Sequence, residues 1–374
     1  MANLQHIRRR IKSVKNIQKI TNAMDMIARS RFNAAREALL SNIPYVTKTK
    51  EIMRRVVSQM RGQEYEHPFL KTRDELIAEQ RDANGKFLFI VIASDKGLAG
   101  SFSSNVFKEA HDTIEYDGTE SETGSQDDDG DDENFHKKNF DALAAVKPMA
   151  NRTQKQQRQM SATGGMARAG AHQGGGGQGG GNIPVAREYH DADYIDGIEL
   201  ITVGRKATTH FKQRGYNIIK SYHGISERPQ YKYAKEITDL VMERYAGGEI
   251  IDVTLIYTRF KSAISCTPDD VTLLPIVTDD YVKAGSTLKE EYIYEPDTVT
   301  LLDKFLPRRL ATRIYGAMLH SAASELSSRM NAMSNATDNA QELVGRLNLF
   351  YNKVRQAGIT NEINEIVGGA NALE

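Results

Sequence analysis

The sequence predicts an α/β protein. We expect a long antiparallel coiled coil of N- and C-terminal helices that carries a small central Rossmann-like domain with a parallel sheet, plus a disordered insertion. Three observations predict this fold. Both ends of the 374-residue chain have apolar residues at helical spacing, the middle alternates short apolar runs with helical stretches, and one segment of the middle has the composition of a disordered chain.

The N-terminal helix, predicted for residues 1–60, has one narrow apolar stripe. Its members recur at steps of three or four residues: Leu4, Ile7, Ile11, Val14, Ile17, Ile20, Met24 and Ile27. No glycine or proline interrupts this stretch before Pro44, and most of the opposite face is charged or polar. Such a helix packs against one partner rather than into a broad core.

The C-terminal helix, predicted for residues 299–374, is that partner. Pro307 suits its first turn. The residues that follow at alternating steps of four and three are Leu326, Met330, Met333, Thr337, Ala340, Val344, Leu347, Tyr351 and Val354. This heptad spacing winds two helices around each other, and some 60 residues at ~1.5 Å each make a rod of ~90 Å. We therefore expect the two ends of the chain to pair in one projecting rod.

The central domain is predicted for residues 61–116 and 194–298. Strands are expected at residues 87–93, 198–203 and 252–258, and helices at residues 105–114, 207–214 and 233–245. Strands that are separated by helices favour a parallel sheet with helices on its faces.

Residues 117–193 are predicted to be a flexible insertion. Residues 115–133 contain ten acids and no Lys or Arg, residues 142–187 contain no acid, and residues 170–181 include eight glycines. A segment of this kind cannot bury enough apolar area to offset its ordering entropy.

Composition excludes several classes of protein. Cys266 is the single cysteine, so an internal disulfide is excluded, and without a Cys/His cluster no metal is expected. The longest strongly apolar run, residues 87–93, is far below the roughly 20 residues of a membrane span, and the first ten residues lack the apolar segment of a signal peptide. We expect a soluble or peripheral protein without a cofactor.

The loop SDKGLAGSF at residues 94–102 follows the first strand and opens a helix, where α/β folds bind phosphates. It matches neither the glycine fingerprint of dinucleotide binders nor the phosphate loop of nucleoside triphosphatases, so we interpret it as a structural turn. The catalytic candidates are His190, His210, His223 and Ser262 with Ser265. Because none has the spacing of a catalytic constellation, we interpret the histidines as solvated loop residues and expect no enzymatic activity and no small-molecule substrate.

The N-terminal 36 residues are strongly basic, with nine Lys and Arg against the single acid Asp25. Nucleic-acid binding is disfavoured because Phe32 is the only aromatic residue there for base stacking. A presequence is disfavoured because the helix continues past 30 residues without a cleavage-like break. Docking onto an acidic protein surface is the favoured interpretation, with a merely solvated face as the alternative for any one residue.

Long motifs at both ends are specific for one family. They are IRRRIKSVKNIQKITNAMDM at residues 7–26, SELSSRMNAM at 324–333, NATDNA at 335–340, YNKVRQAGITNEI at 351–363 and EIVGGA at 365–370. With the loop at residues 94–102, this sequence resembles the gamma subunits of F-type ATP synthases over nearly everything except the insertion.

The resemblance implies a central rotor shaft. In this family the paired helices turn inside a ring of alternating alpha and beta subunits, and the foot, with the α/β domain, sits on the membrane ring of c subunits with epsilon beside it. Rotation presents different faces of the shaft to each beta subunit and so couples ion flow to ATP synthesis, or ATP hydrolysis to pumping. The lack of a presequence favours the cytoplasmic face of a bacterial plasma membrane.

Carried over by position, the resemblance implies a set of contacts with the beta subunits. These residues are Arg8, Arg9, Lys12, Lys15, Gln18, Met24, Thr360, Glu362, Ile363, Ile366 and Val367. The basic members would pair with acidic loops of the ring, and the C-terminal tip, including Leu373, would turn in a largely apolar bearing.

The sequence departs from the family at three places. Asn22 stands where the family often has Lys, and Ala99 where many relatives have Cys. The insertion has no cysteine, which excludes the thiol switch of chloroplast members. A tolerated loop is the favoured interpretation of the insertion, and electrostatic braking of rotation by its acidic run is the alternative hypothesis.

Two other classes of function remain as alternatives. One is a static coiled-coil adaptor with a partner-binding α/β domain, which would tolerate loss of the C-terminal tip. The other is a nucleotide-dependent enzyme that uses the loop around Gly97, which requires nucleotide binding or turnover by the isolated chain.

Overall fold

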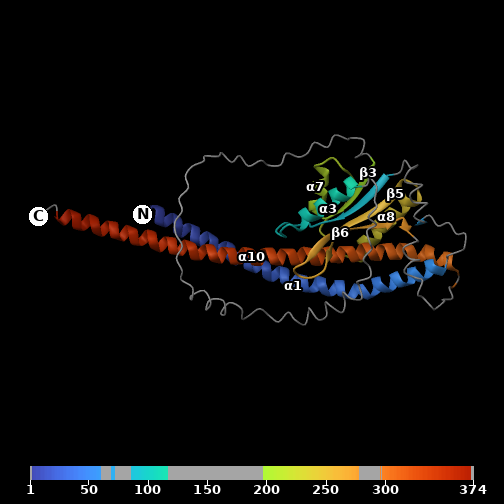
Figure 1. The fold of residues 1–374 in the computed structure, drawn as a ribbon, viewed down its shortest axis with the longest axis horizontal. Coiled ribbons are helices and arrows are strands. Elements are labelled where there is room, and N and C mark those ends of the chain that lie inside the picture. The colour runs from blue at the N-terminus through green and yellow to red at the C-terminus, as the bar shows by residue number, and fades with distance from the viewer. Residues whose placement is uncertain are drawn as a thin grey trace, which may run out of the picture. The chain divides into compact units, whose positions relative to one another are not determined.

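Two long helices, one from each end of the chain, dominate the computed structural model (Figure 1). It describes residues 2–59, 69–71, 86–116, 197–277, 295 and 297–371, and all of them belong to one unit. The insertion expected at residues 117–193 lies outside the described residues. Helix α1 spans Ala2–Gln59 and α10 spans Thr298–Asn371.

The two helices are antiparallel, as predicted. Thr337 Oγ1 donates a hydrogen bond to Thr21 Oγ1 at 2.7 Å, and the side-chain amide of Gln18 donates to that of Gln341. Further along, a Cβ at Gly316 would lie 3.5 Å from the amide nitrogen of Asn42. As residue numbers rise along α1 they fall along α10, which fixes the direction of the pair.

The α1 residues that face α10, here called the seam, differ from those predicted beyond Val14. The seam follows an unbroken heptad of buried or half-buried positions: Ile7, Ile11, Val14, Gln18, Thr21, Asp25, Ala28, Phe32, Ala35 and Leu39. Ile17, Ile20, Met24 and Ile27 were predicted to face the partner helix, and this was wrong, because all four are exposed. Polar and small residues occupy the seam where the partner presents Thr337 and Gln341 for hydrogen bonding.

The seam predicted on α10 is confirmed, since each of its nine positions from Leu326 to Val354 is buried or half-buried. The start of this helix lies one residue before the predicted 299, but the placing of Pro307 in its first turn was wrong. Helix α10 begins at Thr298, and the Asp297 carboxylate caps it by accepting the Thr300 backbone N–H at 2.8 Å. Pro307 lies inside α10, and Pro44 lies inside α1.

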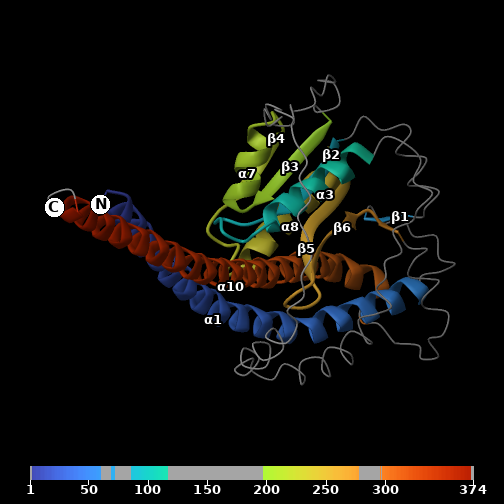
Figure 2. The ribbon, with the colours of Figure 1, turned by 60° about the vertical axis from the view of Figure 1, so that its left-hand side comes forward.

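A five-stranded sheet lies against α10 (Figure 2). Its strands, in spatial order, are β4 (Asn217–Tyr222), β3 (Ile198–Val203), β2 (Lys86–Ile92), β5 (Ile250–Phe260) and β6 (Cys266–Leu274). The first four are parallel, as predicted, and β6 is an antiparallel edge strand. A separate short parallel pair joins β1 (Leu70–Lys71) to β7 (Ile276–Val277).

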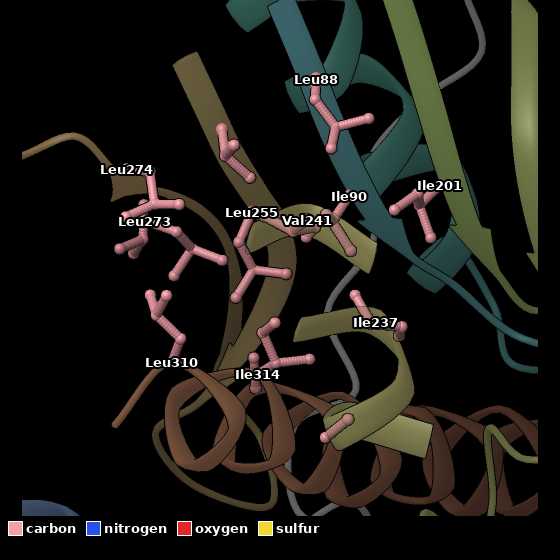
Figure 3. Packing of buried hydrophobic residues seen from close by; sticks show 14 of the residues in the cluster. Leu88, Ile90, Ile201, Ile237, Val241, Leu255, Leu273, Leu274, Leu310 and Ile314 are labelled. Atoms are coloured by element: carbon pink, nitrogen blue, oxygen red, sulfur yellow. The ribbon is translucent and has the colours of Figure 1, made fainter. Parts of the chain in front are cut away.

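Helices cover both faces of the sheet. On one face Phe89 and Val91 of β2 pack with α3 (Phe102–Tyr116) and α7 (Arg205–Lys212). On the other, Leu88 and Ile90 pack with α8 (Tyr231–Ala246) and with Leu310 and Ile314 of α10 (Figure 3). Because α10 contributes to the core of the α/β domain, the long helix and the sheet share one hydrophobic core.

Candidate functional site: the exposed shaft and its junction with the sheet

An apolar stripe runs along the outside of α1. Ile17, Ile20, Met24 and Ile27, here called the outer stripe, have 50%, 56%, 38% and 54% of their surface exposed. They follow one another at steps of three and four residues, so they share one side of the helix. Exposed apolar side chains grouped on one side of a helix are typical of partner-binding surfaces.

A basic patch precedes the outer stripe on the same helix. Arg8, Arg9, Lys12 and Lys15 are all exposed. Among the described residues, no ion pair involves any of these four side chains. Gln18, which was expected on the same contact surface, is half-buried in the seam and bonded to Gln341. The patch therefore presents four exposed cations that no acidic side chain of the described residues neutralises.

The last turns of α10, here called the tip, extend beyond α1. The numbers of facing residues add to about 358 (21 with 337), so Ala2 faces a residue near 356 and α10 continues past it, as Figure 1 shows. The expected contact residues there, Thr360, Glu362, Ile363, Ile366 and Val367, are all exposed. Leu373 lies outside the described residues. The tip is a single helix with apolar side chains and no partner within the described chain.

Polar side chains of α10 form hydrogen bonds with backbone groups at the end of β5 and in the turn that follows it. The hydroxyl of Ser321 accepts the Thr258 backbone N–H at 3.2 Å, and Ser324 donates to the Thr258 carbonyl at 3.4 Å. About one turn beyond Ser324, the Ser327 hydroxyl donates to the Ala263 carbonyl at 2.6 Å. These bonds satisfy backbone groups beyond Ile256, the last β5 residue that pairs with β2.

His320 belongs to the same junction. Its Nδ1 accepts the Phe260 backbone N–H at 3.3 Å, which requires this nitrogen to be unprotonated. Burial and, less strongly, the Arg259 cation lower the pKa of His320 from 6.5 to about 4. Because the pKa of His320 is lower in the folded chain than in the unfolded chain, its contribution to the free energy of unfolding is complete above pH 6.5. This contribution is lost as the pH falls from 6.5 towards 4.

We therefore expect His320→Gln, which keeps an acceptor without a titrating proton, to remove part of the acid sensitivity of folding. Urea unfolding of wild type and variant at about pH 7, 5.5 and 4.5 measures it, and the stability advantage of the wild type should shrink as the pH falls. A difference that does not change with pH would contradict the role of Nδ1.

The loop at residues 94–102 is held by the chain itself. The Asp95 carboxylate accepts the backbone N–H groups of Arg205 at 3.0 Å and Ser226 at 3.1 Å. Burial alone would raise the pKa of Asp95, but these backbone hydrogen bonds outweigh it and hold the pKa below its ordinary value. The Gly97 carbonyl accepts hydrogen bonds from the guanidinium group of Arg329 on α10. These contacts support the interpretation of the loop as a structural turn.

The other candidates are placed apart from one another. His210 was expected in a solvated loop, but it lies half-buried on α7, with its Nε2 3.0 Å from that of His111. His223 is exposed after β4, Ser262 and Ser265 form the turn between β5 and β6, and His190 lies outside the described residues. Within the described ranges, no group of three or more metal-ligating side chains occurs and no helix is apolar enough to span a membrane.

The junction with the sheet was not found from the sequence. Ser321, Ser324 and Ser327 recur every third residue in an alanine-rich helix, and this spacing was the available signal for a polar face. Glu227, which contacts both long helices, lies in the loop between β4 and α8, and no local pattern marks it.

Comparison with known proteins gives a consistent result. A family model described as ATP synthase matches residues 3–129 and 176–373. The chain is 34% identical to the ATP synthase gamma chain of Pelotomaculum thermopropionicum and 32% identical to that of Chlorobium phaeobacteroides, over the full length of each. Among solved structures it resembles a chain of the Euglena gracilis mitochondrial ATP synthase, with a TM-score of 0.54 at 14% identity, covering all of this chain and 95% of the other. This last likeness concerns the fold alone.

Proposed function

This chain belongs to the family of ATP synthase gamma chains, and from that premise we propose which of its surfaces carry torque. As a member, it is a non-catalytic subunit and the rotor shaft of a membrane-associated ATP synthase complex. The proposal concerns its individual partners and the residues that contact them.

The outer stripe and the basic patch contact the ring of alpha and beta subunits. The observation that carries this proposal is that α1 keeps polar Gln18 and Thr21 in its seam. The outer stripe of three isoleucines and Met24 faces outwards instead. Burying an isoleucine is worth about 1.5–3 kcal/mol, so apolar residues left outside a helix pair indicate a second surface to be covered. The basic patch then pairs with acidic loops of the beta subunits, and the face presented to each beta subunit changes as the shaft turns.

The tip turns in an apolar bearing at the top of this ring. Thr360, Glu362, Ile363, Ile366 and Val367 are exposed on one side of an unpaired helix, where an apolar surface of the ring can cover them without displacing any described part of this chain. The α/β domain forms the foot, in contact with the membrane c-ring and the epsilon subunit. Since the two gamma chains named above come from bacteria, we place the complex at the cytoplasmic face of the plasma membrane.

The test is a chain that ends at Ile359, assembled into the complete complex. Because the removed residues described here are exposed, the chain should fold normally, while proton-driven ATP synthesis falls about tenfold or more through loss of apolar anchors. The control is a chain that ends at Asn371. Undiminished synthesis with the shorter chain would contradict the shaft and favour the static adaptor.

A further inference from the structure

One carboxylate joins the α/β domain to both long helices. Glu227, in the loop between β4 and α8, accepts Arg31 of α1 at its Oε2. Its Oε1 accepts Lys96 of the β2–α3 loop at 3.1 Å and Arg329 of α10 at 3.3 Å. Both oxygens are therefore used, and the three cations come from three different segments.

The cluster is largely shielded from solvent at its centre. The side chains of Glu227 and Arg329 are 14% and 12% exposed, and that of Glu325, which accepts Arg329 at 2.6 Å, is 1% exposed. Arg329 also donates to the Gly97 carbonyl. Charge-assisted hydrogen bonds with little access to water are stronger than exposed ion pairs.

The same turn of α1 contacts the domain a second time. Phe32, next to Arg31, packs against Phe260 at the end of β5, with ring centroids 5.7 Å apart. The residues of α1 at positions 31 and 32 thus contact two different parts of the α/β domain, the loop that carries Glu227 and the end of β5.

We infer that Glu227 is a positioning residue that makes the α/β domain and both helices of the shaft turn as one body. The inference rests on the proposed function, in which torque enters at the foot and leaves along the helices. The hydrophobic core beneath the sheet is non-directional, and the serine and histidine hydrogen bonds described above fix α10 to the sheet but do not involve α1. Hydrogen bonds from three directions to one carboxylate resist sliding and twisting, because any displacement misaligns at least one of them.

The test is Glu227→Gln in the assembled complex. The amide replaces one acceptor oxygen with a donor, so at least one cation loses its partner. ATP hydrolysis should stay within about twofold of wild type, while the number of protons pumped per ATP against a pre-formed gradient falls about threefold or more. Glu227→Asp, which keeps the charge, should recover part of the ratio.

Glu249→Gln is the matched control. Glu249 forms an ion pair with Arg244, and both residues of this pair belong to the α/β domain, so the pair does not join the domain to either long helix. This control should leave the pumping ratio unchanged. If Glu227→Gln lowers hydrolysis and pumping in proportion, the carboxylate has only a structural role and the inference is wrong.

Hydrogen exchange of the complete isolated chain separates this inference from the proposed function. Glu227→Gln should speed exchange of backbone amides in the loop around residue 227 and in α1 around residue 31. Unchanged exchange would contradict the positioning role of Glu227 and leave the rotor-shaft proposal intact. In the converse result, Glu227→Gln speeds exchange, but the chain that ends at Ile359 shows undiminished ATP synthesis. That result would contradict the shaft proposal and, with it, the role of Glu227 in torque.

Discussion

A chain that carries Ile17→Gln, Ile20→Gln, Met24→Gln and Ile27→Gln is expected to keep its fold and to lose its function. All four side chains are substantially exposed, so the free energy of unfolding of the isolated chain should stay within about 1 kcal/mol of wild type. Coupled ATP synthesis by the assembled complex should fall about tenfold or more, since the outer stripe no longer buries apolar area on the catalytic ring.

The matched control places glutamine in the seam instead of outside it. Val14→Gln and Ala28→Gln, at positions 8% and 2% exposed, should each lower the free energy of unfolding by about 2 kcal/mol or more. The opposite pattern, a quadruple variant that unfolds beside seam variants that do not, would mean that the outer stripe faces α10.

The pairing of the two helices was predictable, but the face of α1 that pairs was not. The two candidate stripes share their residues up to Val14 and then run side by side: one stays apolar, and the other passes through Gln18, Thr21 and Asp25. Apolar spacing selects the first because it measures which residues avoid water and cannot distinguish a partner within the chain from a partner outside it. The hydrogen bond from Thr337 to Thr21 makes the polar stripe the internal one.

The central strands were predictable because both faces of the sheet are covered. Residues 88–92 of β2 are all buried, and their sequence LFIVI is the continuous apolar run expected of a parallel strand. The edge strands β4 and β6 were missed, since exposed positions break the apolar run in each. The junction was missed for a different reason: its residues are polar and far apart in sequence, and only the tertiary fold brings Arg31 to Glu227.

Gly204→Ala is expected to have the largest effect on stability of any substitution proposed for the sheet. Gly204 follows β3 and precedes α7, with φ of 101°, and a Cβ there would lie 2.2 Å from the Ala93 carbonyl oxygen. That carbonyl cannot retreat easily, because Ala93 N–H is bonded to Val203 and Gly204 N–H to Tyr222. We expect a loss of about 3 kcal/mol or more in the free energy of unfolding, measured by urea denaturation.

Gly215→Ala separates backbone strain from collision. Gly215 also has positive φ, at 82°, but a Cβ there would meet nothing within 4 Å, so its cost should be about 1 kcal/mol. Equal losses at the two positions would show that strain alone acts.

The substitution at Gly204 should also reach the Glu227 cluster. The backbone N–H of Arg205, the residue after Gly204, donates to the Asp95 carboxylate, so displacement at Gly204 would move the loop that carries Lys96 and the Gly97 carbonyl. Gly204→Ala should therefore show faster hydrogen exchange around Glu227. This result would mean that the contact between the α/β domain and the long helices depends on the close approach of Gly204 to Ala93.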